Sequence, residues 1–361
     1  MKKAITYFTR TLMEWYDPEV RPLPWKAIED PYKIWLSEII LQQTRVAQGL
    51  PYYEKFIAAF PTINQLAAAD DDTVMKLWEG LGYYSRARNM LVAARQVVHD
   101  FDGHFPNTYR DILSLKGVGP YTASAIASFA YGIPEAVVDG NVYRVLSRFF
   151  GIDTPIDSTA GKKEFAQLAM DCLDTQQPGI YNQAIMDFGA SQCTPRNPDC
   201  ESCPLREKCE ARRLEMIDLL PVKAKKLKRR TRFFYFLDIQ AGDQTILHKR
   251  TQKDIWQSLY QFPLIEMEKP VKEQLDRLKT TATWRSLFPA DSPPLSGRSK
   301  SFEQTLTHQK IKAVFLKIKL PELPQALPET YFCTPLSKID QYAFPKIIDW
   351  YLNDNSLYLN L

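Results

Sequence analysis

Four cysteines near the middle of the chain constrain its fold more than any other feature. Cys193, Cys200, Cys203 and Cys209 are separated by six, two and five residues. Thiolates this close in the chain can surround a tetrahedral zinc ion or a [4Fe-4S] cluster, since both take four cysteine sulfurs. Reduced or disulfide-bonded thiols are the alternative, which the lack of secretory features disfavours. The spacing therefore predicts a metal centre and leaves its metal open.

Length and composition bound the architecture. With 361 residues, the chain exceeds the roughly 250–300 residues at which single hydrophobic cores stop growing, so we expect two domains. No run approaches the roughly 18 apolar residues of a membrane span, and Thr6, Thr9 and Arg10 interrupt the stretch where a signal peptide would be apolar. We therefore expect a cytoplasmic protein with no membrane partner, in which Cys172 and Cys333 stay reduced.

A net charge of +4 indicates an anionic partner only where the basic residues cluster. They cluster in residues 222–232, where seven positions are Lys or Arg and none is acidic. This segment is compatible with a solvated linker, a phosphate contact, or both. We predict a helical domain over residues 1–215, a basic linker over 216–232 and a second domain over 233–361.

The hydrophobic periodicity changes across that linker. Before it, apolar residues at helical spacing predict helices over residues 31–48, 73–78, 85–98, 121–130 and 142–150. After it, the pattern predicts strands over 233–239 and 245–249, two more within 301–320, helices over 271–279 and 345–352, and a mobile loop over 287–300. We expect a mainly α region followed by a small α/β or α+β domain.

A second motif, Leu-Lys-Gly-Val-Gly-Pro-Tyr-Thr, occupies residues 115–122 between two predicted helices. Gly117 and Gly119 let the backbone turn tightly and approach a ligand, and the amides at the following helix start can bind a phosphate. A dinucleotide fingerprint would need a third glycine at position 122 and a preceding strand, and the sequence has neither. An ordinary turn between helices is the alternative.

Two carboxylates are candidates for chemistry. Glu38 interrupts an apolar stripe of Ile34, Trp35 and Leu41, so we expect burial to raise its pKa and keep it protonated. Asp139 precedes a predicted helix, where it could act as an N-cap or, held ionised by the positive helix end, stabilise a cation. One protonated and one ionised carboxyl group form the arrangement that cleaves glycosidic bonds.

Five motifs together resemble the adenine DNA glycosylases, a helix-hairpin-helix family within the iron-sulfur endonuclease III superfamily. They are Leu-Pro-Trp at 23–25, Ser-Glu-Ile-Ile-Leu-Gln-Gln-Thr at 37–44, Gly-Leu-Gly-Tyr-Tyr-Ser-Arg at 80–86, Gly-Val-Gly-Pro-Tyr-Thr at 117–122 and Asp-Gly-Asn-Val at 139–142. The resemblance implies a helix-hairpin-helix glycosylase fold over about residues 20–210, with a [4Fe-4S] cluster on the cysteines. Trp256, Gln-Phe-Pro at 261–263 and Ala-Phe-Pro at 343–345 resemble the family's Nudix-like α+β domain.

The resemblance also implies a role for each candidate residue in removing adenine opposite 8-oxoguanine or guanine in double-stranded DNA. Glu38 would protonate adenine N7, and Asp139 would stabilise the oxocarbenium-like sugar or trap it covalently. Residues that order the site would be Tyr121 and Asn141, and those that line the adenine pocket would be Trp25, Lys26, Leu41 and Gln183. Residues that contact DNA would be Gln42, Gln43, Thr44, Leu81, Tyr83, Gly117, Val118 and Gly119. Within this set, Gln43 and Tyr83 would fill or wedge the helix, and Thr44 and Leu81 would lie near the oxidised base. Residues that recognise 8-oxoguanine would be Thr307 and His308, and those in the cysteine loop that face phosphate would be Arg196, Arg206 and Lys208.

The sequence departs from the family pattern in three respects. Lys26 stands where Arg is expected and lacks its planar fork. Leu-Thr-His at 306–308 replaces Phe-Ser-His, which puts 8-oxoguanine recognition in question. The C-terminal region lacks the Glu-rich signature of a Nudix hydrolase, so we do not expect nucleoside triphosphate hydrolysis.

Tyr121 occupies the position at which an endonuclease III-like lyase has its lysine nucleophile, so we expect base removal without strand cleavage. A thymine or uracil mismatch glycosylase on the same scaffold and a non-catalytic DNA-binding protein are the alternatives. We expect a monomer that associates with the bacterial nucleoid through DNA.

Overall fold

The structure is a computed structural model that describes residues 2–26, 28–224, 229–271, 275–289, 292–324 and 326–354. By its contacts the chain divides into two compact units. The first comprises Met1–Ala68 and Asn89–Lys226, and the second comprises Ala69–Arg88 and Leu227–Leu361. Residues 225–228 of the basic linker lie outside the described residues. Residues 69–88 belong to the second unit, although the sequence places them within the predicted helical domain.

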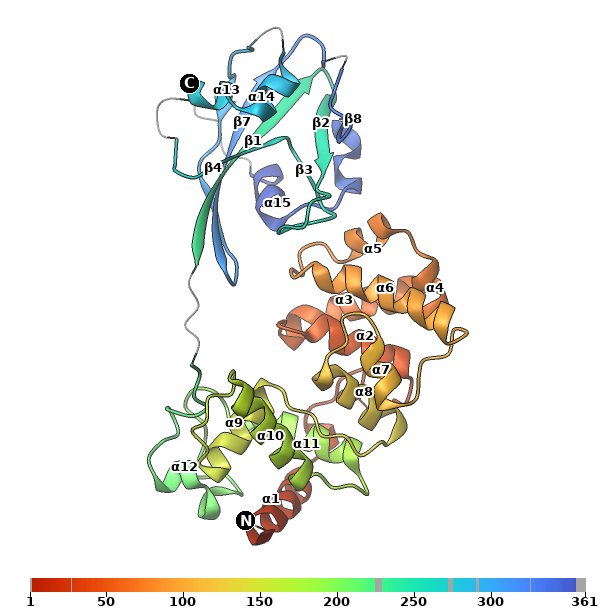
Figure 1. Cartoon of the computed structure of the whole chain (residues 1–361), viewed down its shortest axis with the longest axis vertical. Helices are drawn as coiled ribbons and strands as arrows, with labels where there is room; N and C mark the ends of the chain where they lie inside the picture. Colours follow the sequence, from red (N-terminus) through yellow and green to blue (C-terminus); the bar gives the residue numbers. More distant parts are fainter. Residues whose placement is uncertain are drawn as a thin grey trace. The chain divides into compact units, whose positions relative to one another are not determined.

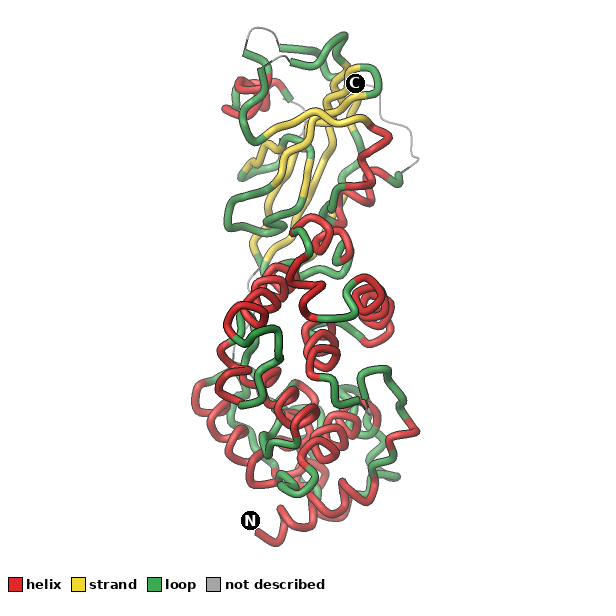
Figure 2. The backbone as a smooth tube through the Cα atoms, turned by 90° about the vertical axis from the view of Figure 1, so that its right-hand side faces the viewer, coloured by secondary structure: helices red, strands yellow, loops and turns green. Residues whose placement is uncertain are grey.

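The described elements of the first unit are all helices joined by loops, whereas the strands drawn in Figure 2 belong to the second. Its helices are α1 (Lys2–Trp15), η1 (Pro18–Val20), α2 (Pro31–Leu41), α3 (Val46–Ala59), α4 (Ile63–Ala68), α7 (Tyr109–Ser114), α8 (Pro120–Tyr131), α9 (Gly140–Phe150), α10 (Thr159–Cys172), α11 (Pro178–Ser191), η2 (Arg206–Lys208) and α12 (Glu210–Arg213). Helix α6 (Ser85–Asp100) begins in the second unit and ends in the first.

Side-chain caps fix where the helices that carry the site begin, and one apolar core fixes how they pack together. Asp30 caps α2 by accepting from the backbone N–H of Tyr32 at 3.0 Å, and Pro31 supplies the fixed φ of the first turn. Helices α1, α9, α10 and α11 share a core that includes Phe8, Phe165 and residues from each helix. This shared core holds the start of α9 beside the C-terminal end of α11, where Gly189 lies against Asn141.

The predicted single helix over residues 31–48 is wrong. Helix α2 ends at Leu41 and α3 begins at Val46, and between them Gln43 has a φ of 57°. A left-handed residue cannot continue a right-handed helix, so the chain turns here. The helices predicted over 85–98, 121–130 and 142–150 are confirmed within two residues at each end.

The second unit is built on a mixed sheet. Its strands are β1 (Arg230–Ala241), β2 (Gln244–Lys249), β3 (Tyr260–Gln261), β4 (Leu264–Met267), β5 (Gly297–Arg298), β6 (Phe302–Thr305), β7 (Gln309–Lys319) and β8 (Tyr331–Pro335). The order is β3-β2-β1-β7-β5, with β4 also on β1, β6 on β7 and β8 on β2. Strands β1 and β7 run parallel, from Arg230 opposite Gln309 to Gln240 opposite Lys319, and the other pairs are antiparallel.

Short helices cover both faces of this sheet (Figure 1). They include α13 (Asp276–Lys279), α14 (Ala282–Leu287) and α15 (Lys346–Leu352), and the unit also contains α5 (Asp71–Leu77) and η3 (Leu336–Gln341). On one face Leu237 of β1 shares a core with Trp284 of α14. On the other, the ring of Phe315 in β7 stacks on Tyr351 of α15 at 3.8 Å. The predicted α+β fold is confirmed, although residues 272–274 of the predicted helix over 271–279 lie outside the described residues.

Hydrogen bonds explain why residues 69–88 group with the C-terminal part of the chain. The carboxylate of Asp72 accepts from the Tyr260 hydroxyl at 2.8 Å. The carboxylate of Glu79 accepts from the Phe344 backbone N–H at 2.6 Å. Arg88 donates to the carbonyl of Gln257 at 2.6 Å, so this segment is tied down along its length.

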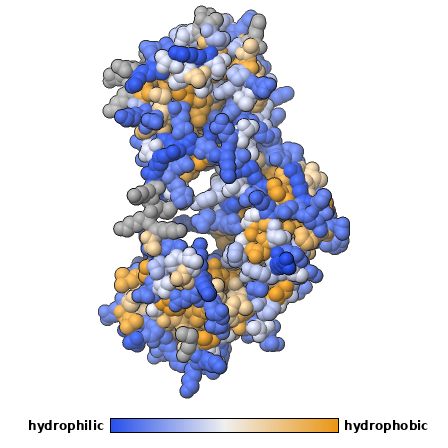
Figure 3. All heavy atoms as spheres, in the orientation of Figure 1, coloured by the Kyte–Doolittle hydropathy of each residue, from blue (hydrophilic) through white to orange (hydrophobic). Residues whose placement is uncertain are grey.

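The face of the molecule drawn in Figure 3 is mostly hydrophilic. On the face drawn in Figure 3, hydrophobic residues form small patches scattered among hydrophilic ones. Among the described residues, none of the helices has the length and apolar character needed to cross a bilayer.

Candidate active site

A cavity of about 680 Å³ in the first unit brings together most of the predicted site residues. The predicted residues that line it are Trp25, Lys26, Glu38, Leu41, Gln42, Gln43, Gly117, Gly119, Tyr121, Asp139, Asn141 and Gln183. They come from the loop before α2, from α2 and the residues that follow it, from the α7–α8 turn, from the start of α9 and from α11. Val118 is buried and Thr44 lies beside the cavity in sequence, but neither lines it.

Glu38 is presented to the cavity by α2, whose side chains are buried on nearly all sides. The residue is 8% exposed, and this burial raises the pKa of its carboxyl group from 4.5 to about 7. The nearby charge of Asp139 raises the pKa further, and the hydrogen bond with Tyr121 opposes both. The predicted rise is confirmed, so Glu38 can donate a proton at neutral pH.

Tyr121 stands in the first turn of α8, immediately after the Gly-Val-Gly turn. Its hydroxyl contacts the carboxyl group of Glu38 and lies 3.6 Å from the sulfur of Met186 on α11. Burial raises the pKa of Tyr121 well above 10, so the phenol stays neutral. Gly117 has a φ of 80°, and a Cβ there would lie 2.7 Å from Asn89, so glycine is required for this turn.

Asp139 caps α9. One carboxylate oxygen accepts from the backbone N–H groups of Asn141 at 2.8 Å and Val142 at 2.7 Å, and the other accepts from the Asn141 side-chain amide at 2.9 Å. The expectation that this position lowers the pKa of Asp139 is wrong. Burial in the cavity raises the pKa, and this effect exceeds the opposing effects of the three hydrogen bonds and of Arg144.

Arg144 and Arg148 on α9 connect this carboxylate to the cysteine loop, and the sequence did not suggest either. Arg144 donates to the Asn141 side-chain oxygen at 2.9 Å and to the carbonyl of Cys193 at 2.8 Å. Arg148 donates to the sulfur of Cys193 at 3.5 Å and to the carbonyl of Thr194 at 2.7 Å. One helix therefore positions both Asp139 and the first cysteine.

The four cysteines form no disulfide and all are partly buried, and Cys193, Cys203 and Cys209 pack against the core of α1, α9, α10 and α11. Burial raises the pKa of the Cys203 thiol to about 11 and also raises the pKa of Cys200 and Cys209. Among the described residues, no three metal-ligating side chains meet closely enough to hold one ion. A cubane cluster does not require this, because each cysteine binds a different iron atom. A donor set made only of thiols fits such a cluster.

The basic residues of the cysteine loop have different surroundings. Arg206 forms an ion pair with Glu207 at 2.9 Å, and the Lys208 ammonium lies 4.1 Å from the ring centre of Tyr7. Arg196 is exposed. Phosphate contact by these side chains stays a prediction.

Two residues predicted to enter DNA have strained backbones. Gln43 in the first unit has a φ of 57°, and Tyr83 in the second has a φ of 49°. Both are exposed, Tyr83 by 48%. A non-glycine residue held in the left-handed region costs about 1–3 kcal/mol, and such residues concentrate at functional sites.

A second cavity, of about 490 Å³, lies within the second unit. Its lining includes the predicted residues Leu81, Tyr83, Thr307 and His308. The hydroxyl groups of Tyr83 and Thr307 are hydrogen-bonded at 2.8 Å. The β6–β7 turn holds Thr307 in place, because the Leu306 N–H donates to the carbonyl of Gln309 at 2.7 Å. The residues predicted to contact the base opposite adenine thus meet in one cavity, except for Thr44 in the first unit.

Asp187 on α11 is a further site residue that the sequence did not reveal. It is 4% exposed, accepts from Arg21 at 2.6 Å and forms an ion pair with Lys26, whose ammonium also donates to the carbonyl of Arg21 at 3.0 Å. All three residues line the cavity of Glu38. Asp187 follows Gln183 by four residues and so shares its face of α11, but no helix is predicted there from the sequence, so this spacing could not be used.

Three family models match the chain. The HhH-GPD superfamily base excision DNA repair protein matches residues 36–170, and the iron-sulfur binding domain of endonuclease III matches residues 193–209. The NUDIX domain matches residues 234–354. The cysteine loop therefore binds a [4Fe-4S] cluster, and the second unit contains a Nudix-like domain.

Curated relatives extend over most of the chain. The adenine DNA glycosylase of Buchnera aphidicola subsp. Baizongia pistaciae is 38% identical over 265 residues, which cover 71% of this chain and 73% of the relative. The adenine DNA glycosylase of Buchnera aphidicola subsp. Schizaphis graminum is 36% identical over a match that covers 76% of this chain and 80% of the relative. The adenine DNA glycosylase of Homo sapiens is 44% identical over 60% of this chain, but over 41% of its own length.

Solved structures match the helical region. A thermostable thymine-DNA glycosylase is 30% identical with a TM-score of 0.55, covering 59% of this chain and 98% of its own. A non-covalent endonuclease III–DNA complex is 21% identical with a TM-score of 0.52, covering 60% and 98%, and supports the fold alone.

Proposed function

Because the chain belongs to the adenine DNA glycosylase family, we propose that it removes adenine paired with 8-oxoguanine or guanine in double-stranded DNA. It is a base excision repair enzyme that acts on N-glycosyl bonds. The observation that carries the proposal is that Glu38 and Asp139 line one cavity, with the pKa of Glu38 raised to about 7. We further propose that it acts as a monomer in the bacterial cytoplasm.

Glu38 supplies the proton. Adenine leaves the sugar far more readily once a ring nitrogen is protonated, and a carboxyl group with a pKa near 7 is matched to that task. We assign the transfer to N7 of an adenine that has been flipped out of the duplex into this cavity. Tyr121 keeps the carboxyl group oriented through their hydrogen bond.

Asp139 stabilises the positive charge that develops on the sugar as the glycosidic bond breaks. Its carboxylate is fixed by three hydrogen bonds from Asn141 and Val142, so it needs no reorganisation during the reaction. The same geometry is compatible with a transient covalent bond from Asp139 to the sugar. Adenine leaves with the bonding electron pair as the glycosidic bond breaks, and water then adds to the sugar carbon and gives its proton to the Glu38 carboxylate, which leaves an abasic site.

The cavity offers no free amine for a lyase reaction. Lys26 is the one lysine among the described residues that line it, and Asp187 and the carbonyl of Arg21 hold its ammonium group. A Schiff base requires an amine that can attack the sugar. We therefore propose a monofunctional glycosylase that leaves the strand intact.

The opposite base is read by the second unit. Adenine is a normal base, so its excision has to depend on its partner. 8-Oxoguanine differs from guanine in carrying N7–H and O8, and the Thr307 hydroxyl can accept from the first or donate to the second. Its place beside Tyr83, Leu81 and His308 in one cavity supports this role.

Base hydrolysis transfers no net electrons, so the cluster is not needed for electron transfer in this reaction. We therefore assign it a role in structure and in positioning DNA. When bound, it supplies four iron–thiolate bonds that crosslink the loop. Arg144 and Arg148 on α9 bind Cys193 in this loop, so an ordered loop also fixes the position of the start of α9.

Excision of thymine or uracil from mismatches is the second candidate function, favoured by the structural match to a thymine-DNA glycosylase.

A double variant tests the reading of the opposite base. Thr307→Ala with His308→Ala is expected to keep excision from G·A and lose most of the preference for 8-oxoguanine·A. Thr251→Ala is the control, because Thr251 is exposed in the same unit and does not line the cavity. An unchanged substrate ratio in the double variant would place the reader elsewhere. Point variants are preferable to a truncation near Leu220, which would also uncover residues 69–88.

A further inference from the structure

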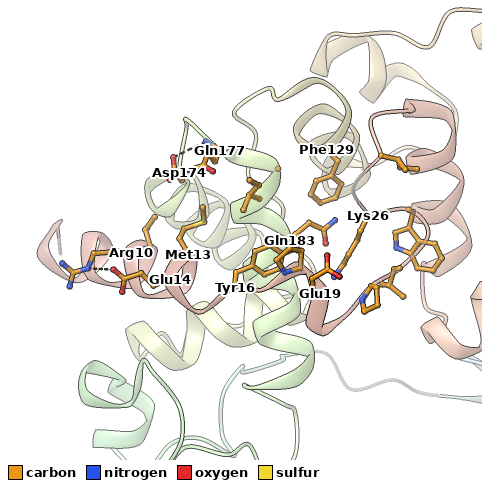
Figure 4. A pocket seen from close by; sticks show the side chains of 18 of the residues that line it. Arg10, Met13, Glu14, Tyr16, Glu19, Lys26, Phe129, Asp174, Gln177 and Gln183 are labelled. Atoms are coloured by element: carbon orange, nitrogen blue, oxygen red, sulfur yellow. Dashed lines mark hydrogen bonds and ion pairs between the residues drawn. The ribbon is translucent and has the colours of Figure 1, made fainter.

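A cavity in the first unit that is larger than the Glu38 cavity has no role in the mechanism above. It measures about 1310 Å³ and lies between α1, the loop before α2 and the start of α11. Small-molecule sites usually enclose about 300–1,000 Å³, so this one is large enough for a nucleobase to pass through it. Figure 4 shows Lys26, Gln183 and Phe129 at one end and Arg10 and Glu14 of α1 at the other.

This cavity adjoins the cavity of Glu38. Leu23, Trp25, Lys26 and Gln183 line both of them, so one layer of side chains separates the two spaces. Trp25 is 7% exposed and packs edge-on against Tyr53 at 5.1 Å. This part of the layer is therefore fixed by packing.

The two polar members of the layer differ in how firmly they are held. The Lys26 side chain is 8% exposed and is held by its ion pair with Asp187. The half-buried side chain of Gln183 makes no hydrogen bond within the part of the chain that the structure describes. Rotating an unbonded side chain costs little, so Gln183 is the member that can open the layer.

The larger cavity is acidic. The carboxylates that line it are Glu14, Glu19, Glu29, Asp171 and Asp174, against Arg10 and Lys26 as basic residues. A concave surface with this charge repels a polyanion. DNA bound at the Glu38 cavity is therefore not expected to fill the larger one, which stays open to solvent.

We propose that the larger cavity is the exit route for the excised adenine. The inference rests on the proposed function. After hydrolysis, the free base lies between the inner wall of the Glu38 cavity and the abasic sugar of the bound strand, which blocks the path by which it entered. Rotation of Gln183 lets the neutral base pass into the larger cavity and reach solvent while the DNA stays bound.

Wild-type enzyme and one plugged variant test this route. Ile180 is 46% exposed, lines only the larger cavity and lies one helical turn before Gln183 on α11. Ile180→Trp fills the passage next to Gln183 without touching the Glu38 cavity. Val92→Trp is the matched control, because Val92 is 44% exposed and lines neither cavity.

Single-turnover reactions with DNA carrying radiolabelled adenine separate the steps. Strand scission with alkali reports bond cleavage, rapid filtration reports free adenine, and a nitrocellulose filter reports bound DNA. We expect wild-type enzyme and Val92→Trp to release adenine before the DNA dissociates. Ile180→Trp should cleave at the wild-type rate and release adenine at least about tenfold more slowly, which corresponds to about 1.4 kcal/mol in the exit barrier.

Two results would overturn the exit route. One is that wild-type enzyme releases adenine only together with the DNA. The other is that Ile180→Trp releases adenine at the wild-type rate after normal cleavage. Absence of adenine cleavage in wild-type enzyme would instead refute the proposed function, so the two failures are distinguishable.

Discussion

Replacement of Glu38 by glutamine tests two consequences of its burial: its ability to donate a proton to the base, and the pH dependence of the protein's stability. Glutamine has nearly the same shape, accepts the hydrogen bond from Tyr121 and cannot donate a proton as an acid. Loss of a general acid usually lowers the rate by about 10²–10⁴. We therefore expect Glu38→Gln to bind mismatched DNA as wild type does and to lose base release by at least about a hundredfold. In the wild type, the rate should fall as the pH rises through about 7, because Glu38 must be protonated.

The same substitution should stabilise the protein at alkaline pH. The pKa of Glu38 is about 7 in the folded state and about 4.5 when unfolded, so the folded state binds the proton more tightly. The stability that this proton provides is fully present below pH 4.5 and is lost as the pH rises through 7. At about 1.4 kcal/mol for each pKa unit, the wild type loses about 3 kcal/mol in total, and glutamine loses none.

Thermal unfolding at two pH values measures this loss. We compare the free energy of unfolding of Glu38→Gln with that of the wild type. Between about pH 5.5 and about pH 8, the difference in favour of Glu38→Gln should grow by about 2 kcal/mol. For a unit of about 200 residues, this corresponds to a rise of about 4–8 °C in the difference between the two Tm values. An equal pH dependence of Tm in both proteins, or single-turnover base release near the wild-type rate in the variant, would refute the reasoning.

The remaining predictions concern the second carboxylate, the cluster and the ion pair. Asp139→Asn removes the counter-charge of the sugar cation and should lower single-turnover base release by about 10²–10³; an unchanged rate would exclude the two-carboxylate scheme. Elemental analysis of active protein should find about four iron and four sulfide per chain, and activity with zinc alone would contradict this. Asp187→Asn leaves Lys26 and Arg21 without their shared partner and should destabilise the protein by about 3–5 kcal/mol, measured as a lower Tm; an unchanged Tm would mean that the pair contributes nothing.

Features of the site that are determined by residues close in sequence could be predicted from the sequence. The burial of Glu38 follows from the apolar side chains three and four residues away on α2, and the cap at Asp139 follows from its place before α9. The break between α2 and α3 was missed because Gln43 is not a residue that favours a left-handed φ.

Contacts between distant segments account for the other differences. The pKa of Asp139 rises because segments far from it in sequence close the cavity around it, which no local pattern records. The Lys26–Asp187 ion pair joins residues separated by 161 positions. The grouping of residues 69–88 with the second unit likewise depends on Tyr260 and Phe344, which lie far along the chain.

Base release from a set of four duplexes tests the central claim most directly. The duplexes carry 8-oxoguanine·A, G·A, G·T or G·uracil at one position and are otherwise identical, and each is reacted under single-turnover conditions with wild-type enzyme and Glu38→Gln. We predict that wild-type enzyme releases adenine from the first two, faster from 8-oxoguanine·A, and that Glu38→Gln releases almost none. Release of thymine or uracil with adenine left intact would contradict the account.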